Sequence, residues 1–171
     1  YRRRSMSGLA AFVVPPDGGE RIRGPVGGPT FIKSRAETTG AAFTLLENVI
    51  PPGEGPPRHV HTREHEMWFV LDGTFRFIAD ERILEAPAGA FVFVPLGTPH
   101  CFQNVGAEDA RILVMFAPSG MERFFERHAD LPPGPVDPDT YRAIAAGCGM
   151  EVVGPPLAVS HPLDARPPAA G

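Results

Sequence analysis

The central part of the chain, from about residue 31 to residue 117, is a succession of short β-prone runs separated by turns. The runs read TFIKS, AAFTLLENVI, EMWFVL, TFRFIA, AFVFVP, HCFQNV and ARILVMFA. Gly, Pro and Asn-containing turns lie between them, and Asp72-Gly73 is typical of a tight hairpin because both central positions of that turn need a positive φ. Many short strands at this spacing predict an all-β sandwich or barrel.

Composition narrows the classes of partner. The 171 residues are enough for one domain with a hydrophobic core, and the net charge of −4 offers no basic surface for nucleic acid or for an anionic membrane. No apolar run approaches the roughly 20 residues that span a bilayer. Two cysteines, Cys101 and Cys148, are too few for a disulfide framework, and no long apolar stretch or small-residue cleavage site follows the basic start YRRRSMSG. We therefore expect a reduced, cytoplasmic location.

The chain divides into four segments. We expect an N-terminal arm over 1–30, in which the apolar run 9–14 could form a short strand and is a candidate for exchange between subunits. The predicted barrel covers 31–118, a helical extension covers 119–149, and a Pro- and Ala-rich tail covers 150–171. Composition alone predicts a loose tail, pinned in place by another subunit if by anything.

Capping patterns predict two helices in the extension. Ser119 is followed three residues later by Glu122, which is the spacing of a capping box. After a Pro- and Gly-rich break, Asp137 can cap a second helix, with Pro138 at the first helical position and Gly147 as its end.

The segment 56–73, PPRHVHTREHEMWFVLDG, holds three of the six histidines. Side chains alternate along a strand, so His59 and His61 share one face. Glu66 begins the next strand and can meet both histidines across the hairpin if that face points inward, and His100, after the turn PLGTPH, is a fourth candidate. Three imidazoles and one carboxylate suit one divalent Fe, Mn, Ni, Co, Zn or Cu ion, and leave positions open for catalysis.

Neighbouring polar and aromatic residues are assigned other roles. Alternation turns His65 away from Glu66, and Glu64 lies in the turn, where it is either solvated or a partner of a ligand. Trp68 and Phe102 follow ligands by two residues and are predicted to wall a substrate pocket, with plain core packing as the alternative. Cys101 is expected to be a small buried hydrophobic residue.

The same residues carry a family resemblance. One motif reads G-x5-H-x-H-x4-E-x6-G, with its defined positions at Gly53, His59, His61, Glu66 and Gly73. The other reads G-x5-P-x-G-x2-H-x3-N, with its defined positions at Gly89, Pro95, Gly97, His100 and Asn104. Both match the motifs of the cupin superfamily. The amino-acid sequences of the two segments that hold them, 59–73 and 89–106, most resemble those of the small, single-domain quercetin-dioxygenase-like cupins.

The resemblance implies a fold and an activity. It implies a single jelly-roll β-barrel that binds a metal through His59, His61, Glu66 and His100 and is followed by a short helical extension. It also implies that two such chains pair as a homodimer. We expect an oxygen-dependent dioxygenase that acts on a small phenolic, enolic or polyketide-like substrate, with Glu66 also able to act as a base. The alternatives are a non-redox isomerase or cyclase and a small-molecule binder without catalytic activity.

Overall fold

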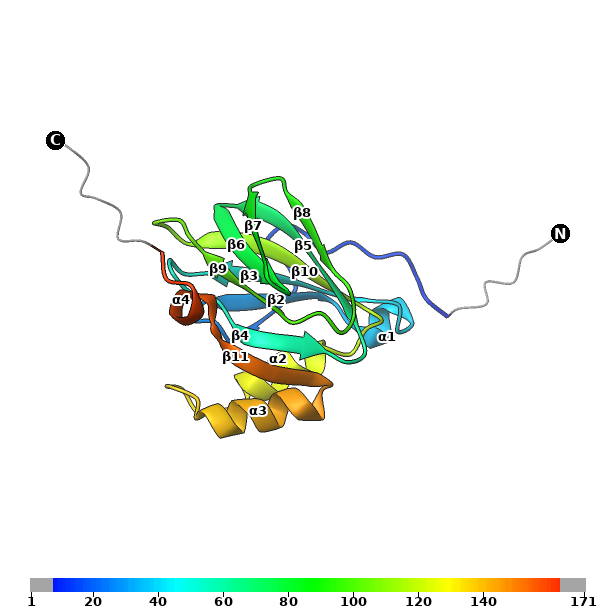
Figure 1. Ribbon diagram of the computed structural model, residues 1–171. Coiled ribbons are helices and arrows are strands. Elements are labelled where there is room, and N and C mark those ends of the chain that lie inside the picture. Colours follow the sequence, from blue (N-terminus) through cyan, green and yellow to red (C-terminus); the bar gives the residue numbers. More distant parts are fainter. Residues whose placement is uncertain (1–7, 164–171) are drawn as a thin grey trace.

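Two β-sheets stacked face to face form the body of the protein, and helices cover one end of the stack (Figure 1). The computed structural model describes residues 8–163. The six-stranded sheet has the order β1 (Glu20–Arg23), β2 (Pro29–Ser34), β3 (Thr44–Ile50), β10 (Ala110–Ala117), β5 (His65–Asp72) and β8 (Phe91–Val94). The five-stranded sheet has the order β11 (Met150–Pro156), β4 (Pro57–His61), β9 (His100–Asn104), β6 (Thr74–Ala79) and β7 (Arg82–Pro87). The helices are α1 (Ala36–Thr39), α2 (Glu122–Ala129), α3 (Pro138–Gly147) and α4 (Leu157–Ser160).

Alternation along the strands decides which side chains enter the space between the sheets. In β5 the side chains of Glu66, Trp68 and Val70 are buried, whereas His65 and Phe69 are exposed. The central strand β10 pairs antiparallel with both β3 and β5, and its residues Ile112, Val114 and Phe116 are likewise buried. The mainly β fold expected from the short runs is therefore present, because each run places one apolar face inward.

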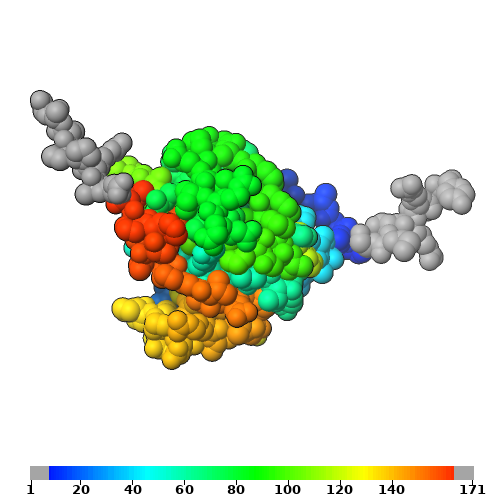
Figure 2. Space-filling model, in the orientation of Figure 1, coloured from blue at the N-terminus to red at the C-terminus, as the bar shows by residue number. Residues whose placement is uncertain are grey.

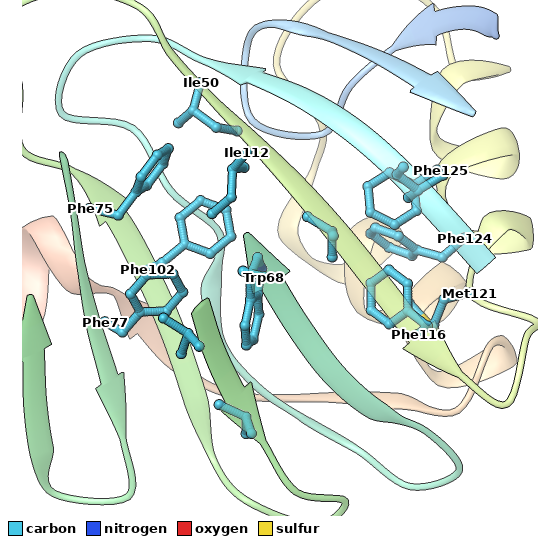
Figure 3. Packing of buried hydrophobic residues seen from close by; sticks show 14 of the residues in the cluster. Ile50, Trp68, Phe75, Phe77, Phe102, Ile112, Phe116, Met121, Phe124 and Phe125 are labelled. Carbon is cyan, nitrogen blue, oxygen red and sulfur yellow. The ribbon is translucent and has the colours of Figure 1, made fainter. Parts of the chain in front are cut away.

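Aromatic side chains fill the interior (Figure 3). Trp68 lies edge-on to Phe77, with ring centroids 5.1 Å apart, and Phe102 packs against both. A second group gathers where the sheets meet α2, and it consists of Phe116, Met121, Phe124 and Phe125. The helical extension thus shares one hydrophobic core with the sheets.

The sheets differ from the closed barrel that we expected. No ladder of hydrogen bonds joins the two sheets within residues 8–163, so the architecture is an open two-sheet sandwich. The Asp72-Gly73 turn is also not a hairpin, because β5 and β6 belong to different sheets. Gly73 has φ +83°, and a Cβ there would come within 2.5 Å of the Cβ of Ala110. Asp72 does not have the positive φ that the predicted turn needs, and a turn motif does not specify whether its two strands pair.

The predicted start of the first helix was wrong. Ser119 does not cap α2, whose N-cap is Met121. Glu122 is instead fully buried and accepts hydrogen bonds from the backbone N–H of Ala36 and of Gly120, and from the hydroxyl of Thr44. Its carboxylate therefore fastens the start of α2 to the six-stranded sheet.

The second helix agrees with the prediction. The helix α3 runs from Pro138 to Gly147, and the side chain of Asp137 accepts a hydrogen bond from the backbone N–H of Thr140. None of the helices in the described range is long and apolar enough to cross a membrane.

Both end segments differ from expectation. The apolar run 9–14 forms no strand, and the described residues before β1 run alongside the six-stranded sheet. The segment predicted to be a loose tail contains β11, which pairs antiparallel with β4, and α4. Within the described part of the chain, β11 is thus held by pairing with this chain's own strand β4. The predicted tail residues 164–171 lie outside the described range.

Candidate metal centre

Four polar side chains converge between the two sheets. His59 and His61 project from β4, two residues apart and hence on one face, and His100 projects from β9, where it is the register partner of His59. Glu66 comes from β5 in the opposite sheet. The carboxylate therefore meets the imidazoles across the sandwich, and not across a hairpin as we expected, because β4 and β5 pair with different neighbours.

The four side chains form a compact, buried group. One possible ligand atom from each lies within 4.8 Å of all the others. Oε2 of Glu66 is 2.8 Å from Nε2 of His61, 2.8 Å from Nε2 of His100 and 3.8 Å from Nε2 of His59. Each of these residues is at most 5% exposed. A carboxylate and three imidazoles in this arrangement could bind a metal ion.

Backbone carbonyls orient two of the imidazoles. Nδ1 of His59 lies 2.7 Å from the carbonyl oxygen of Pro57, and Nδ1 of His100 lies 2.8 Å from that of Thr98. A carbonyl oxygen can only accept, so each Nδ1 carries a proton, and each Nε2 points to the centre of the group, where that of His100 contacts Oε2 of Glu66. This is the arrangement found for metal-binding histidines.

The protonation states of His59 and Glu66 also suit metal binding. Burial and the neighbouring His100 lower the pKa of His59 to about 4, so its ring is neutral at pH 7. Burial alone would raise the pKa of Glu66, but the nearby His61 and the close ring nitrogens of His100 and His59 outweigh it and hold the pKa well below its usual range. Neutral imidazoles and an ionised carboxylate are the states that coordinate metals.

His61 provides the test of whether these residues fit a metal. Its Nε2 lies 2.8 Å from Glu66, yet the contact lacks the geometry of a hydrogen bond, and Nε2 has no hydrogen-bond partner within residues 8–163. An unpartnered buried nitrogen is costly unless something satisfies it. A cation at the centre of the group would do so, so the donor set fits a bound metal.

A small cavity adjoins the group. Its volume is about 40 Å³, and its walls are mostly apolar. Phe102 and Phe116 contribute from the sheets, Phe124 and Phe125 from α2, and Tyr141 from α3. Burial and the nearby carboxylate of Glu66 raise the pKa of Tyr141, so its hydroxyl stays protonated and can donate a hydrogen bond into the cavity.

Other residues singled out in the sequence are placed as follows. Phe102 lines the cavity, whereas Trp68 packs behind it with its ring centroid 5.4 Å from that of His100. His65 is exposed, and its Nδ1 accepts a hydrogen bond from the backbone N–H of Leu96. Cys101 is buried, and burial raises the pKa of its thiol to about 11, which makes it a poor nucleophile.

Sequence reasoning missed Tyr141 as a cavity residue and left the role of Glu64 open. Tyr141 lies on α3, and no local pattern shows which distant strands one face of that helix meets. Glu64 is 2% exposed, so it is not solvated, and its Oε2 lies 3.8 Å from Nδ1 of His61. Its position three residues after His61, in the same connecting loop, was the available signal.

Comparison with known proteins bears on the fold. The model of the family described as "Cupin domain" matches residues 47–116, from β3 to β10. Among curated proteins, the uncharacterized protein MJ1618 of Methanocaldococcus jannaschii is 28% identical over 74 residues, which cover 43% of this chain and 59% of that protein. The chain thus matches about three fifths of that relative's length.

Solved structures with the same fold were found as well. A sugar phosphate isomerase of the cupin superfamily from Silicibacter pomeroyi has a TM-score of 0.54 at 21% identity, covering 63% of this chain and 76% of that one. An RmlC-like cupin from Shewanella frigidimarina also has a TM-score of 0.54, at 16% identity, covering 68% of this chain and 95% of that one. The family model thus matches the strands that carry the buried group of three histidines and a glutamate, and the solved structures share the fold of this chain.

Proposed function

We propose that this protein is a metal-dependent enzyme, and specifically an oxygen-dependent oxygenase acting on a small phenolic or enolic molecule. The observation that carries the proposal is the junction of four buried donor groups with a small, mostly apolar cavity of about 40 Å³. A cavity of this size accepts a molecule as small as dioxygen, or the reacting end of a larger substrate. Its apolar walls favour dioxygen and keep bulk water away from the reacting atoms.

Each residue has a proposed task. His59, His61, Glu66 and His100 would hold one divalent transition metal, which when bound would supply Lewis acidity and, for a redox-active ion, electrons. The hydroxyl of Tyr141 would donate a hydrogen bond to a substrate oxygen. Phe102 and Phe116 would exclude water and orient the apolar part of the substrate beside the histidines.

Glu66 is proposed first as a ligand. Its pKa is held well below the usual range, so in the arrangement seen here it is a weak base. Its second predicted role, as a proton acceptor, requires its contacts with the histidines to loosen during the reaction, because those contacts are what stabilise the ionised form.

The test combines metal analysis with oxygen uptake. Protein loaded separately with Fe(II), Mn(II), Ni(II), Co(II), Cu(II) or Zn(II) would be screened against flavonols, enolic diketones and polyketide-like phenols, with and without dioxygen. We expect oxygen consumption that needs both a redox-active metal and a substrate. Turnover that continues under strictly anaerobic conditions would contradict this proposal and favour the alternative, a non-redox isomerase or cyclase.

The matched control lies just across the short loop that joins β4 to β5. His61→Ala removes a proposed ligand, whereas His65→Ala removes an exposed imidazole four residues later. We expect oxygen uptake to disappear in the first variant and to persist in the second. Equal activity in both would contradict the proposed site.

A further inference from the structure

A larger groove lies directly outside the metal cavity. Its volume is about 960 Å³, and it lies between β11 on one side and α3 with the loop that precedes it on the other. In Figure 2 these walls are the orange strand and the yellow segment below it. Val152 and Val153 contribute from β11, and Val136 contributes from the loop.

The groove and the cavity beside the donor group have two lining residues in common. Pro25 and Tyr141 line both spaces. Tyr141 is held edge-on against Phe124, with ring centroids 5.4 Å apart, and lies beside His128 at 6.1 Å. Pro25 is held in the segment between β1 and β2. The ring of Tyr141 is therefore the side chain at this boundary whose rotation could join the two spaces without movement of the strands that bear the histidines.

The groove carries positive charge. Its lining includes Arg23 and Arg142 and contains no carboxylate among the described residues. Arg23 donates hydrogen bonds to the carbonyl oxygens of His128, Leu131 and Pro132, which hold its guanidinium in place without neutralising it. Arg142 pairs with Asp139, but the two side chains are 58% and 90% exposed, so the pair is weak and exchangeable.

We propose that this groove is the substrate's entrance and outer binding site, that Tyr141 is its inner gate, and that the substrate is an organic anion with an apolar body. The inner cavity has room only for the reacting end, so the remainder of any aromatic substrate must lie elsewhere. The valines and prolines of the groove suit an apolar body, and the two arginines suit a carboxylate. This inference rests on the proposed metal site, and it names the class of substrate that reaches it.

The gate is tested by the rate at which a chelator removes cobalt, which needs no knowledge of the substrate. Protein loaded with Co(II) would be mixed with excess EDTA, and the visible absorption of the bound ion would be followed over time. Because EDTA is far larger than the inner cavity, we expect the parent protein to lose cobalt slowly, at a rate set by opening of the gate. Tyr141→Ala should lose it about 10-fold faster or more, whereas Tyr141→Phe should stay within about 2-fold of the parent.

A second variant distinguishes gating from simple destabilisation. Val153 is 46% exposed on the wall of the groove. Val153→Trp should therefore narrow the entrance without disturbing the packing of the core. We expect cobalt loss from this variant to be slower than from the parent, which partial unfolding cannot produce. Unchanged rates in both Tyr141→Ala and Val153→Trp would overturn the gate.

The class of ligand is tested with two probes of similar shape. Phenylpropionate has an apolar ring and a carboxylate, and 3-phenylpropanol has the same ring without the charge. We expect millimolar phenylpropionate to slow cobalt loss, the alcohol to have a smaller effect, and Arg142→Gln to remove the difference. Equal effects of the two probes would overturn the anionic class.

The outcomes separate this inference from the proposed function. Uptake of one Co(II) tests the metal site, and the pattern of loss rates tests the groove and its gate. Absence of oxygen-dependent turnover together with the expected rates would contradict only the proposed oxygenase. Oxygen-dependent turnover, together with rates of cobalt loss that are the same in the Tyr141 and Val153 variants as in the parent, would contradict only the proposal for the groove and its gate.

Discussion

Oε2 of Glu64 lies 3.8 Å from Nδ1 of His61, and neither atom has a hydrogen-bond partner within residues 8–163. The outer nitrogens of His59 and His100 both face backbone carbonyls, so His61 differs in facing a carboxylate. A movement of about 1 Å would convert this approach into a charge-assisted hydrogen bond. Such a bond would fix the tautomer of His61 with its lone pair on Nε2, toward the other donors.

We expect Glu64→Gln to weaken metal binding by about 10- to 100-fold, which is the usual effect of losing a carboxylate behind a metal-binding histidine. The amide keeps the shape of the side chain, so packing is preserved. The single tryptophan, Trp68, lies 5.4 Å from the ring of His100, and quenching of its fluorescence by Cu(II) or Co(II) would report binding. The control is Glu81→Gln, whose side chain is 87% exposed. Equal affinities for the two variants would contradict the role of Glu64.

Each proposed ligand should be required for stoichiometric metal. Purified parent protein should hold about one ion per chain, and His100→Ala should hold much less, because a site with three remaining ligands loses both charge and geometry. Elemental analysis after dialysis provides the measurement. His161, which is exposed and remote from the four donors, serves as the control through His161→Ala. Retention of a full equivalent by His100→Ala would rule out the assigned donor set.

Stability of the metal-free protein should fall as the pH is lowered through the range from about 6.5 to about 4. Burial and His100 lower the pKa of His59 to about 4 in the folded state, whereas the unfolded chain binds the same proton near pH 6.5. The unfolded state therefore holds more protons across this window, so the free energy of unfolding rises with pH there. Urea unfolding at several pH values gives the slope, which should be shallower in His59→Gln. An unchanged slope in that variant would assign the effect elsewhere.

Core packing predicts that two truncations in the five-stranded sheet, one of an aromatic and one of an aliphatic side chain, lower the free energy of unfolding by very different amounts. Phe77 is fully buried against Trp68, and Phe77→Ala should lower the free energy of unfolding by about 3–5 kcal/mol through lost burial and the cavity left behind. Ile83 is 46% exposed on the neighbouring strand, and Ile83→Ala should cost less than about 1 kcal/mol. Chemical denaturation of both variants provides the comparison, and similar losses would contradict the assigned core.

The outer face of the six-stranded sheet is our candidate for the interface of a homodimer. Phe69, Phe91 and Phe93 lie on β5 and β8 and are 43%, 64% and 51% exposed. Phe69 and Phe91 are also register partners, so their rings form a continuous apolar surface. Light scattering should give a dimer mass for the parent protein and a monomer mass for Phe91→Arg. A monomeric parent at working concentration would contradict this proposal.

The sequence by itself determined the local features of this protein. Alternation of apolar residues predicted seven strands and the shared face of His59 and His61, and capping chemistry predicted α3 from Asp137 and Pro138. The spacing of the histidines and Glu66 predicted which side chains would gather, because strand geometry and the motif positions are encoded within short stretches of chain.

Only the tertiary structure decided how those pieces meet. It decided that β5 and β6 lie in different sheets, that Glu66 reaches the histidines across the sandwich, and that β11 pairs with β4. It also placed Tyr141 in the wall of the cavity and Glu64 beside His61, at the edge of the donor group. Pairing between distant strands and the docking of a helix depend on burial of surfaces that are far apart in the chain, and no local pattern contains that information.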